Sequence, residues 1–207
     1  LKGDYLKLDG YNSNGAPIYS KVDTYQEASA DQAKVDQKKF NWLEYYKIKM
    51  SGETFTKIYD KLVLRSLFEF GFLGNYNSDR GDVPFERFFL GGDGLANFTM
   101  DGREVIQLRG YENQALTPYD KNGSQNGSII YNKFSLELRY PLTLNPNASI
   151  YALAFFDAGS AYESFKTYNP FDLHRSAGFG LRVFMPAFGL LGIDFGHGFD
   201  AAPGATQ

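Results

Sequence analysis

The stretch Lys133-Phe134-Ser135-Leu136-Glu137-Leu138-Arg139-Tyr140 alternates strictly between polar and apolar side chains. Successive side chains of a β-strand point to opposite faces, so this period of two predicts a strand with one apolar and one polar face. It is the most regular alternation in the chain. The other segments are therefore compared with it to find further strands.

Five further segments carry strand patterns, so the sequence predicts six strands in an all-β chain. They are Trp42–Met50, Leu62–Phe72, Ser149–Ala161, Ala177–Val183 and Leu191–Phe195. A seventh strand is compatible with Tyr5–Leu8, within a start that is otherwise polar and irregular and includes a predicted solvated loop at Gln26–Lys39. Aromatic residues make up 17% of the chain, and together with 22 glycines they are typical of β-barrels with aromatic girdles and tight turns.

The predicted strand Leu62–Phe72 is long for a water-soluble protein. Its roughly 11 residues would extend about 36 Å at about 3.3 Å each. Tilted by about 45°, a strand of that length crosses the apolar band of roughly 25 Å that surrounds a membrane barrel. A strand of a soluble β-sandwich usually has about 5–6 residues. The soluble sandwich is the alternative, since both folds use alternating strands, but strand length and Phe-rich faces favour an antiparallel transmembrane β-barrel.

The connections between the predicted strands differ strongly in length. Turns are predicted at Thr56–Asp60, Pro141–Pro146 and Met185–Gly189, whereas the connections Gly74–Ile130 and Ser160–Asp172 are longer. Short turns on one side and long loops on the other are typical of an outer-membrane barrel. Loops longer than about 12–15 residues are uncommon in compact chains unless they have a function. We therefore expect the segment from about residue 74 to 130, which has no clear strand period, to be a functional surface loop.

Composition and motifs argue against several other classes. A formal net charge of −3 gives no indication of nucleic-acid binding, and no run of 18 apolar residues predicts a transmembrane helix. The chain has no Cys and only two His, so no zinc site is expected. Asp120–Asn126 resembles the start of a calcium loop, but Gln125 stands where Gly is needed and Tyr131 where Glu is needed. The sequence therefore predicts no bound metal and no cofactor.

The stretch Leu108-Arg109-Gly110-Tyr111 resembles the Val-Arg-Gly-Phe signature of the Omp85 family. The surrounding frame is also similar, with Pro84-Phe85-Glu86-Arg87-Phe88 and Gly91-Gly92 before it and Thr117-Pro118 after it. Downstream, four segments follow in the family's order: Ser135–Leu138, Phe155–Gly159, Ser176–Gly180 and Gly189–Gly196. The resemblance covers roughly Trp42 to Phe199, and its specificity comes from combining the signature with these ordered segments.

The resemblance implies a sixteen-stranded barrel in the outer membrane of a Gram-negative bacterium, with periplasmic POTRA repeats ahead of it. The chain is similar in particular to the family's barrel-assembly factors of the Bacteroidetes type, which fold and insert other barrel proteins. The implied partners are outer-membrane lipids, client β-barrel proteins and accessory proteins of the barrel-assembly machinery (BAM). No POTRA repeat and no final strand with a C-terminal aromatic are recognisable, so we expect residues 1–207 to be the C-terminal portion of the barrel, without the two strands of the family's lateral seam.

The resemblance also implies that Arg109 reaches into the barrel lumen and meets Glu137 and Asp157 on neighbouring strands. The residues support this, because Glu137 lies on a polar strand face and Asp157 follows an apolar run in which a carboxylate needs a partner. A guanidinium can bond two carboxylates through its planar fork. Gly110 permits a tight turn, and Tyr111 offers an aromatic body with a hydroxyl group. The alternative is that these are ordinary solvated charges, worth under about 1 kcal/mol.

The expected function is assembly of barrel proteins without enzymatic activity, in which unpaired backbone groups at an open seam accept a client strand. Another family member, TamA-like or a two-partner secretion translocator, would share the barrel and differ in its upstream repeats. A passive porin would need a charged constriction loop, in which Arg109 could serve. A barrel enzyme would need Ser or Asp beside His; Asp172 with His174 is the candidate, and no Gly-x-Ser-x-Gly motif occurs.

Overall fold

The computed structural model describes residues 2–11, 17–24, 45–76, 83–94, 103–119, 123–145 and 148–203. Its contacts divide the chain into two compact units, one of residues 1–46 with 74–83 and one of residues 47–73 with 84–207. The predicted loop Gln26–Lys39 lies outside the described residues. No helix within the described ranges is long and apolar enough to cross a membrane.

The first unit contains an antiparallel hairpin of β1 (Lys2–Tyr11) and β2 (Pro17–Thr24). The expectation of an irregular start is therefore wrong for these two segments, although a strand at Tyr5–Leu8 was anticipated. The physical reason is that Leu6, Leu8, Ile18 and Tyr19 are all exposed, so burial imposes no single apolar face that would produce a clear period.

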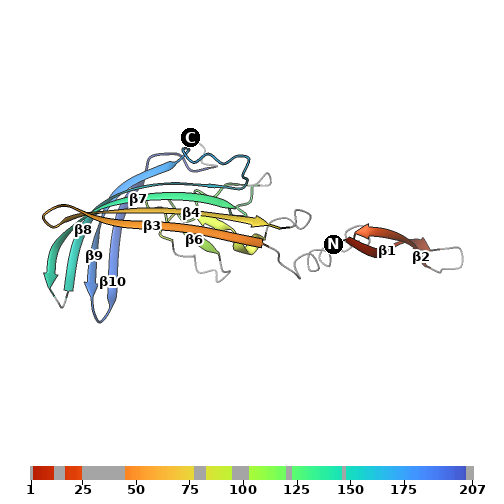
Figure 1. Ribbon diagram of the computed structural model, residues 1–207, viewed down its shortest axis with the longest axis horizontal. Coiled ribbons are helices and arrows are strands. Elements are labelled where there is room, and N and C mark those ends of the chain that lie inside the picture. Colours follow the sequence, from red (N-terminus) through yellow and green to blue (C-terminus); the bar gives the residue numbers. More distant parts are fainter. Residues whose placement is uncertain are drawn as a thin grey trace. The chain divides into compact units, whose positions relative to one another are not determined.

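The second unit is built on a six-stranded sheet with the order β10-β9-β8-β7-β4-β3, whose strands run side by side and curve together (Figure 1). The strands are β3 (Tyr45–Tyr59), β4 (Leu62–Asn75), β7 (Ile130–Asn145), β8 (Ala148–Tyr162), β9 (His174–Met185) and β10 (Gly189–Gly198). β7 pairs antiparallel with β4 and β8, and β9 pairs antiparallel with β8 and β10. The prediction of an antiparallel all-β fold is confirmed, and β7 with 16 residues is long enough to span a bilayer.

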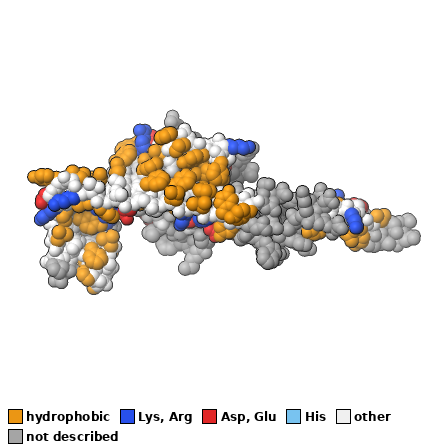
Figure 2. Space-filling view, in the orientation of Figure 1, with side chains coloured by type: hydrophobic (Ala, Val, Ile, Leu, Met, Phe, Trp, Pro, Cys, Tyr) orange, Lys and Arg blue, Asp and Glu red, His pale blue; other side chains and the backbone are white. Residues whose placement is uncertain are grey.

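One face of this sheet is apolar and exposed. Phe68 lies opposite Phe134 with ring centroids 5.2 Å apart, and Phe179 lies opposite Phe195 with centroids 5.4 Å apart. Figure 2 shows hydrophobic side chains gathered over the sheet. In a soluble protein such a face would be covered, whereas a membrane barrel turns it toward lipid. We call it the outer face, and the opposite face, which carries Glu137 and Asp157, the inner face.

Two of the predicted turns are wrong in position. β3 continues to Tyr59, so its turn lies at Asp60 and Lys61, where Asp60 takes a positive φ of 44°. β7 runs through Pro141 to Asn145, with an irregular register between Pro141 and Thr143. A bulge of this kind accommodates a residue that has no N–H to donate. The predicted turn at Met185–Gly189 is confirmed, since β9 ends and β10 begins there.

The long segment between β4 and β7 is not structureless. It contains the 3-10 turn η1 (Pro84–Glu86) and two short strands, β5 (Phe88–Leu90) and β6 (Glu104–Ile106), which pair in parallel. Strands of three residues are too short to show a period, which explains why the sequence did not predict them. β5 contacts β7 and β8, and Phe88 is fully buried. The described residues 84–94, 103–119 and 123–129 of this segment therefore pack on the inner face, and we refer to them as the inner loop.

Candidate functional site

The inner loop is fixed to the sheet by Arg109, which lies between two buried carboxylates. Its Nε and Nη2 donate to Asp157 Oδ2 and Oδ1 at 2.7 and 2.9 Å, and its Nη1 lies 2.8 Å from Glu137 Oε1. Arg109 is 7% exposed, Glu137 4% and Asp157 1%. The structure thus brings together the three charged residues that the sequence singled out, in the fork geometry that only a guanidinium can supply.

Two neighbours that the sequence analysis missed complete the pocket for the guanidinium. Ser135 Oγ donates to Asp157 Oδ1 at 2.5 Å and accepts a bond of 3.2 Å from Arg109 Nη2. The ring of Phe155 lies beneath the guanidinium, with its centroid 3.8 Å from Arg109 Cζ. Ser135 faces Asp157, and Glu137 faces Phe155, as cross-strand partners on β7 and β8. Arg109 of the loop therefore contacts two adjacent cross-strand residue pairs on the inner face.

Glu137 is shared among several cations. Arg139 Nε donates to Glu137 Oε2 at 2.8 Å, and Arg65 Nη1 lies 3.2 Å from Glu137 Oε1. Arg65 in turn pairs with Glu53 on β3. The alternation on the polar face of each strand could have indicated that these groups share one face, but not that they pair. The result is a row of ion pairs across the inner faces of β3, β4 and β7.

Asp194 on β10 continues this row of ion pairs toward the opposite edge of the sheet. Arg182 Nη1 and Nη2 donate to its two carboxylate oxygens at 2.6 Å each, and Arg109 Nη1 lies 3.7 Å away. Burial alone would lower the pKa of Arg109, but the hydrogen-bonded Asp157 and the nearby Glu137 outweigh it and hold this pKa above its usual value. The surroundings of Arg109 therefore favour its charged form.

Gly110 lies where no side chain fits. It has a φ of +88°, and a Cβ on it would lie 2.9 Å from the carbonyl carbon of His197 and from Ser176 Cβ. The facing residue on β10 is also a glycine, Gly196. A Cβ on it would lie 2.9 Å from the backbone N of Gly110. The loop backbone therefore approaches the β9–β10 pair as closely as backbone can.

Tyr111 closes the site on the side of the C-terminal segment. Its hydroxyl donates to the carbonyl of Arg175 at 2.7 Å, and the amide of Asp200 donates to that hydroxyl at 3.3 Å. Arg175 Nη2 bonds Asp200 Oδ1 at 2.9 Å and Nε bonds Oδ2 at 3.1 Å. The bond from Arg175 lowers the pKa of Asp200 to about 2. Tyr111 thus ties the loop to the chain that follows β10.

A second ionic contact fixes the inner loop to β3, and the sequence did not indicate it. Lys47 Nζ lies 3.1 Å from Glu86 Oε2 and 2.6 Å from Glu104 Oε2, and Lys49 Nζ lies 2.7 Å from Glu104 Oε1. Lys47 Nζ also lies 4.7 Å from the centroid of Phe88. We call this group the lysine clamp. β3 and β10 are the two edges of the six-stranded sheet, so the loop is held at both of them.

The sequence analysis also considered a metal site and a calcium-like segment. Among the described residues, no group of three or more His, Asp or Glu could hold a metal ion. Residues 120–122 of the calcium-like segment Asp120–Asn126 lie outside the described residues. A cavity of about 810 Å³ lies beside Arg109, Tyr111 and Asp194. Charges of both signs line it, as expected for a water-filled lumen.

Comparison with known proteins identifies the family. Residues 24–207 match the model described as the Omp85 superfamily domain. The chain belongs to the Omp85 superfamily. The match covers most of the chain, including every residue of the site.

A solved structure supports the same fold for this Omp85 chain. BamA from Haemophilus ducreyi, in a crystal structure lacking POTRA domains 1–3, aligns with a TM-score of 0.57 at 19% identity. The alignment covers 76% of this chain and 32% of that one, so the chain spans about a third of the matched structure. The comparison with curated proteins finds no match. The predicted β-barrel fold and the location in a Gram-negative outer membrane are confirmed, while the Bacteroidetes type stays a prediction.

Proposed function

We propose that this Omp85 chain is the C-terminal portion of the barrel of an assembly factor, which folds and inserts client β-barrel proteins into the outer membrane. The observation that carries the proposal is the buried contact of Arg109, from the inner loop, with Glu137 and Asp157 on the sheet. Withdrawing this cation would leave the buried Asp157 without a cation and would remove one of the three cations that pair with Glu137, which favours a loop fixed to the sheet. The proposed activity needs no cofactor and no enzyme chemistry.

The outer face supports contact with membrane lipid. Phe134, Leu136 and Leu138 on β7 are 41%, 46% and 37% exposed, although they are strongly apolar. Lipid chains are the surroundings in which such a face is stable. The charged groups lie on the inner face instead, where the loop covers Glu137 and Asp157.

The proposed mechanism uses an open barrel seam as a template. Strand edges present N–H and C=O groups that lipid cannot satisfy, so a client strand gains backbone hydrogen bonds by pairing there. A barrel that opens at one place must keep its remaining wall in shape. The inner loop would provide this by holding β7 and β8 through Arg109, β9 and β10 through Gly110 and Tyr111, and β3 through the lysine clamp.

The partners of the whole protein follow from this proposal. Client β-barrel proteins would pair at the seam, and outer-membrane lipids would contact the outer face. POTRA repeats ahead of the barrel and BAM accessory proteins would deliver the clients.

The test is complementation by the full-length protein carrying Arg109→Ala in cells depleted of the wild type. We expect several client barrels to fall in the outer membrane, because the loop loses its buried anchor. Lys166→Ala, an exposed cation in the loop between β8 and β9, is the matched control. Normal client levels with a stably inserted Arg109→Ala protein would rule out the proposed role of the anchor.

Other Omp85 members are the second candidate, because a TamA-like protein or a two-partner secretion translocator would use the same barrel. The depletion experiment separates them. Loss of many unrelated barrels indicates an assembly factor, whereas loss of one secreted substrate or a narrow client set indicates a translocator. Unchanged clients together with lost conductance would indicate a porin.

A further inference from the structure

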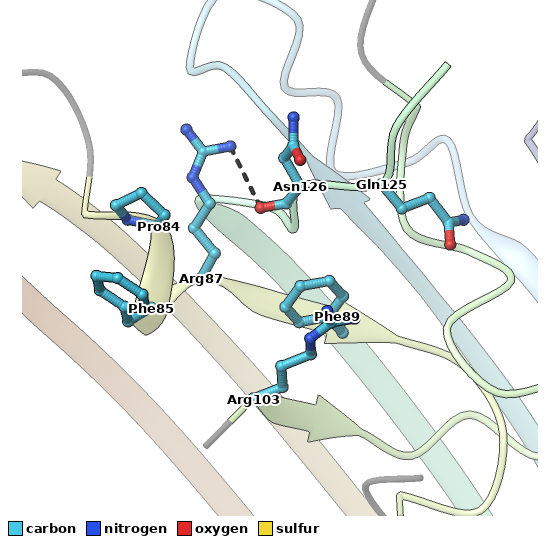
Figure 3. A pocket seen from close by; sticks show the side chains of 7 residues that line it. All are labelled: Pro84, Phe85, Arg87, Phe89, Arg103, Gln125 and Asn126. Carbon is cyan, nitrogen blue, oxygen red and sulfur yellow. Dashed lines mark hydrogen bonds between the residues drawn. The ribbon is translucent and has the colours of Figure 1, made fainter. Parts of the chain in front are cut away.

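The two long connections of the second unit pack on opposite faces of the sheet. The inner loop lies on the inner face and forms a cavity of about 540 Å³ from its own segments, where Arg87 donates to the carbonyl of Asn126 (Figure 3). Residues 163–173, which we call the β8–β9 loop, instead fold back over the outer face. The outer face therefore includes side chains of a loop as well as those of strands.

Polar side chains of β7 and β8 bind the backbone of the β8–β9 loop. Asn132 lies two residues from Phe134 and pairs with Ser160, so both side chains belong to the outer face. Asn132 Nδ2 donates to the carbonyl of Pro170 at 3.2 Å, and Ser160 Oγ donates to the carbonyl of Asp172. Asn132 is 1% and Ser160 2% exposed. The loop thus covers two polar groups on a largely apolar face.

Tyr162 holds the same loop at the end of β8. Its hydroxyl oxygen lies 2.6 Å from the carbonyl oxygen of Asn169 and 3.1 Å from that of Asp172. Water can bond the carbonyl groups of an irregular segment at an aqueous surface, whereas beside lipid these groups need donors from the protein. Donors supplied by the outer face therefore suit a loop that lies against a membrane.

Aromatic rings join the β8–β9 loop to β4. The ring centroids of Phe165 and Phe72 lie 5.9 Å apart, and those of Tyr168 and Phe70 lie 6.2 Å apart. These distances are within the range of about 4.5–7 Å at which aromatic pairs attract. Phe70 and Phe72 alternate along β4 with Phe68, which places all three rings on the outer face. The loop therefore continues the apolar surface of the sheet.

The loop also exposes two large apolar side chains. Phe171 is 89% and Phe165 53% exposed. If the loop lay in water, almost the whole ring of Phe171 would be hydrated, which is unfavourable for an apolar group. Aromatic side chains are instead typical of the level at which a membrane barrel meets the lipid headgroups.

We propose that the β8–β9 loop lies in the membrane interface, held to the outer face, with Phe165 and Phe171 inserted among lipids of the outer leaflet. The inference rests on the lipid contact of the outer face proposed above, since the loop rings continue that face. Long loops of outer-membrane barrels are extracellular, which indicates the outer leaflet. Glu163 and Asp172 keep the loop at the headgroup level, because a charge is costly in the hydrocarbon.

Spin labelling of the full-length protein in liposomes tests the position of the loop. Residues 1–207 contain no Cys, so Phe171→Cys can carry a single nitroxide once any cysteine elsewhere is replaced by serine. Oxygen, which dissolves in lipid chains, should relax this label several-fold more than a water-soluble nickel chelate. Leu136→Cys on the outer face of β7 should show the same preference, and Asp60→Cys in the β3–β4 turn the reverse. If Phe171→Cys does not insert, Phe165→Cys provides the same test.

A matched pair of tyrosine variants tests how the loop is held. Tyr162→Phe keeps the ring and removes the hydroxyl that binds the loop backbone. The label at residue 171 should then become more mobile and several-fold more accessible to nickel. Tyr140→Phe removes a hydroxyl from the outer face of β7 and should leave the label unchanged. Equal spectra in the two variants would overturn the anchoring.

The labels also separate this inference from the proposed function. Nickel preference at residue 171 with oxygen preference at Leu136→Cys would overturn the position of the loop alone. Nickel preference at both would overturn the lipid contact of the outer face, and the inference with it. A label at residue 171 that neither reagent reaches would indicate a protein cover and overturn lipid as the partner.

Discussion

Arg109 and Asp157 form a two-point ion pair although they lie 48 residues apart, with Nε–Oδ2 at 2.7 Å and Nη2–Oδ1 at 2.9 Å. The pair joins the inner loop to β8 and is almost fully buried. Because both carboxylate oxygens are engaged, the pair fixes the direction of the guanidinium as well as its position. That leaves Nη1 directed to Glu137 on the next strand.

Arg109→Ala should destabilise the barrel by about 3–5 kcal/mol, because it leaves Asp157 buried without a cation and removes one of the cations that pair with Glu137. Arg109→Lys should retain part of the stability, since an ammonium group restores charge but cannot make two parallel bonds to Asp157. Urea unfolding in detergent micelles, followed by the circular dichroism of the β-sheet, measures both. Equal midpoints for the lysine variant and wild type would contradict the importance of the fork.

Gly110→Ala should be more destabilising than Gly189→Ala, although both glycines have a similar positive φ of +88° and +83°. A Cβ on Gly110 meets the backbone of β10, whereas a Cβ on Gly189 has nothing within 4 Å. The difference between the two unfolding midpoints isolates the contact from the conformational strain, which costs roughly 1 kcal/mol at either position. Identical midpoints would show that the loop does not rest on β10.

Lys47→Ala should loosen the inner loop without unfolding the sheet. Glu86 would lose the bond from Lys47, and Glu104 would keep only Lys49. Amide hydrogen exchange in β5 and β6 should accelerate by about tenfold or more, because local opening becomes easier. Lys57→Ala, on the exposed part of the same strand, is the control and should leave this exchange unchanged. Acceleration in both variants would mean that the effect is not specific to the clamp.

The contact between Tyr111 and the C-terminal segment should be lost at low pH. The folded-state pKa of Asp200 is about 2, below the ordinary value of 3.8, so its contribution to stability is complete above about 3.8 and disappears as the pH falls through 2. Because the chain has 15 tyrosines, exposure of Tyr111 would be followed as the difference between wild type and Tyr111→Phe in quenching of tyrosine fluorescence by added iodide between pH 5 and 2. Asp200→Asn should remove this acid transition, while Asp60→Asn, in the β3–β4 turn, should not.

Much of the sheet could be predicted because its two faces differ in polarity. The alternation from Phe134 to Tyr140 correctly placed Glu137 on the inner face, since one face of β7 is apolar and exposed and the other meets the loop. The end of β7 could not be predicted, because a bulge beside Pro141 is a feature of pairing with β8 rather than of local sequence. Only part of β1, at Tyr5–Leu8, was anticipated and β2 was missed, because the large apolar side chains Leu6, Leu8, Ile18 and Tyr19 are all exposed.

Prediction of the site from the sequence was limited in a similar way. Arg109, Glu137 and Asp157 were found from the signature and from the physics of a lone carboxylate. Ser135 is one of many serines, and Phe155 faces inward only because of the register that places it opposite Glu137. The lysine clamp joins Lys47 to Glu86 and Lys49 to Glu104, pairs that are separated by 39 and 55 positions in the sequence. No local pattern shows which cation meets which acid over such separations.

We propose that Arg109 and Asp157 act as one unit that holds the inner loop during client assembly. A double-mutant cycle of Arg109→Ala and Asp157→Ala, measured as the folding rate of a client barrel by the full-length protein in proteoliposomes, tests it most directly. We predict that each single variant slows folding by about tenfold or more, and that the double variant is no slower than either. Independent effects that multiply in the double variant, or folding at the wild-type rate in Arg109→Ala, would contradict the account.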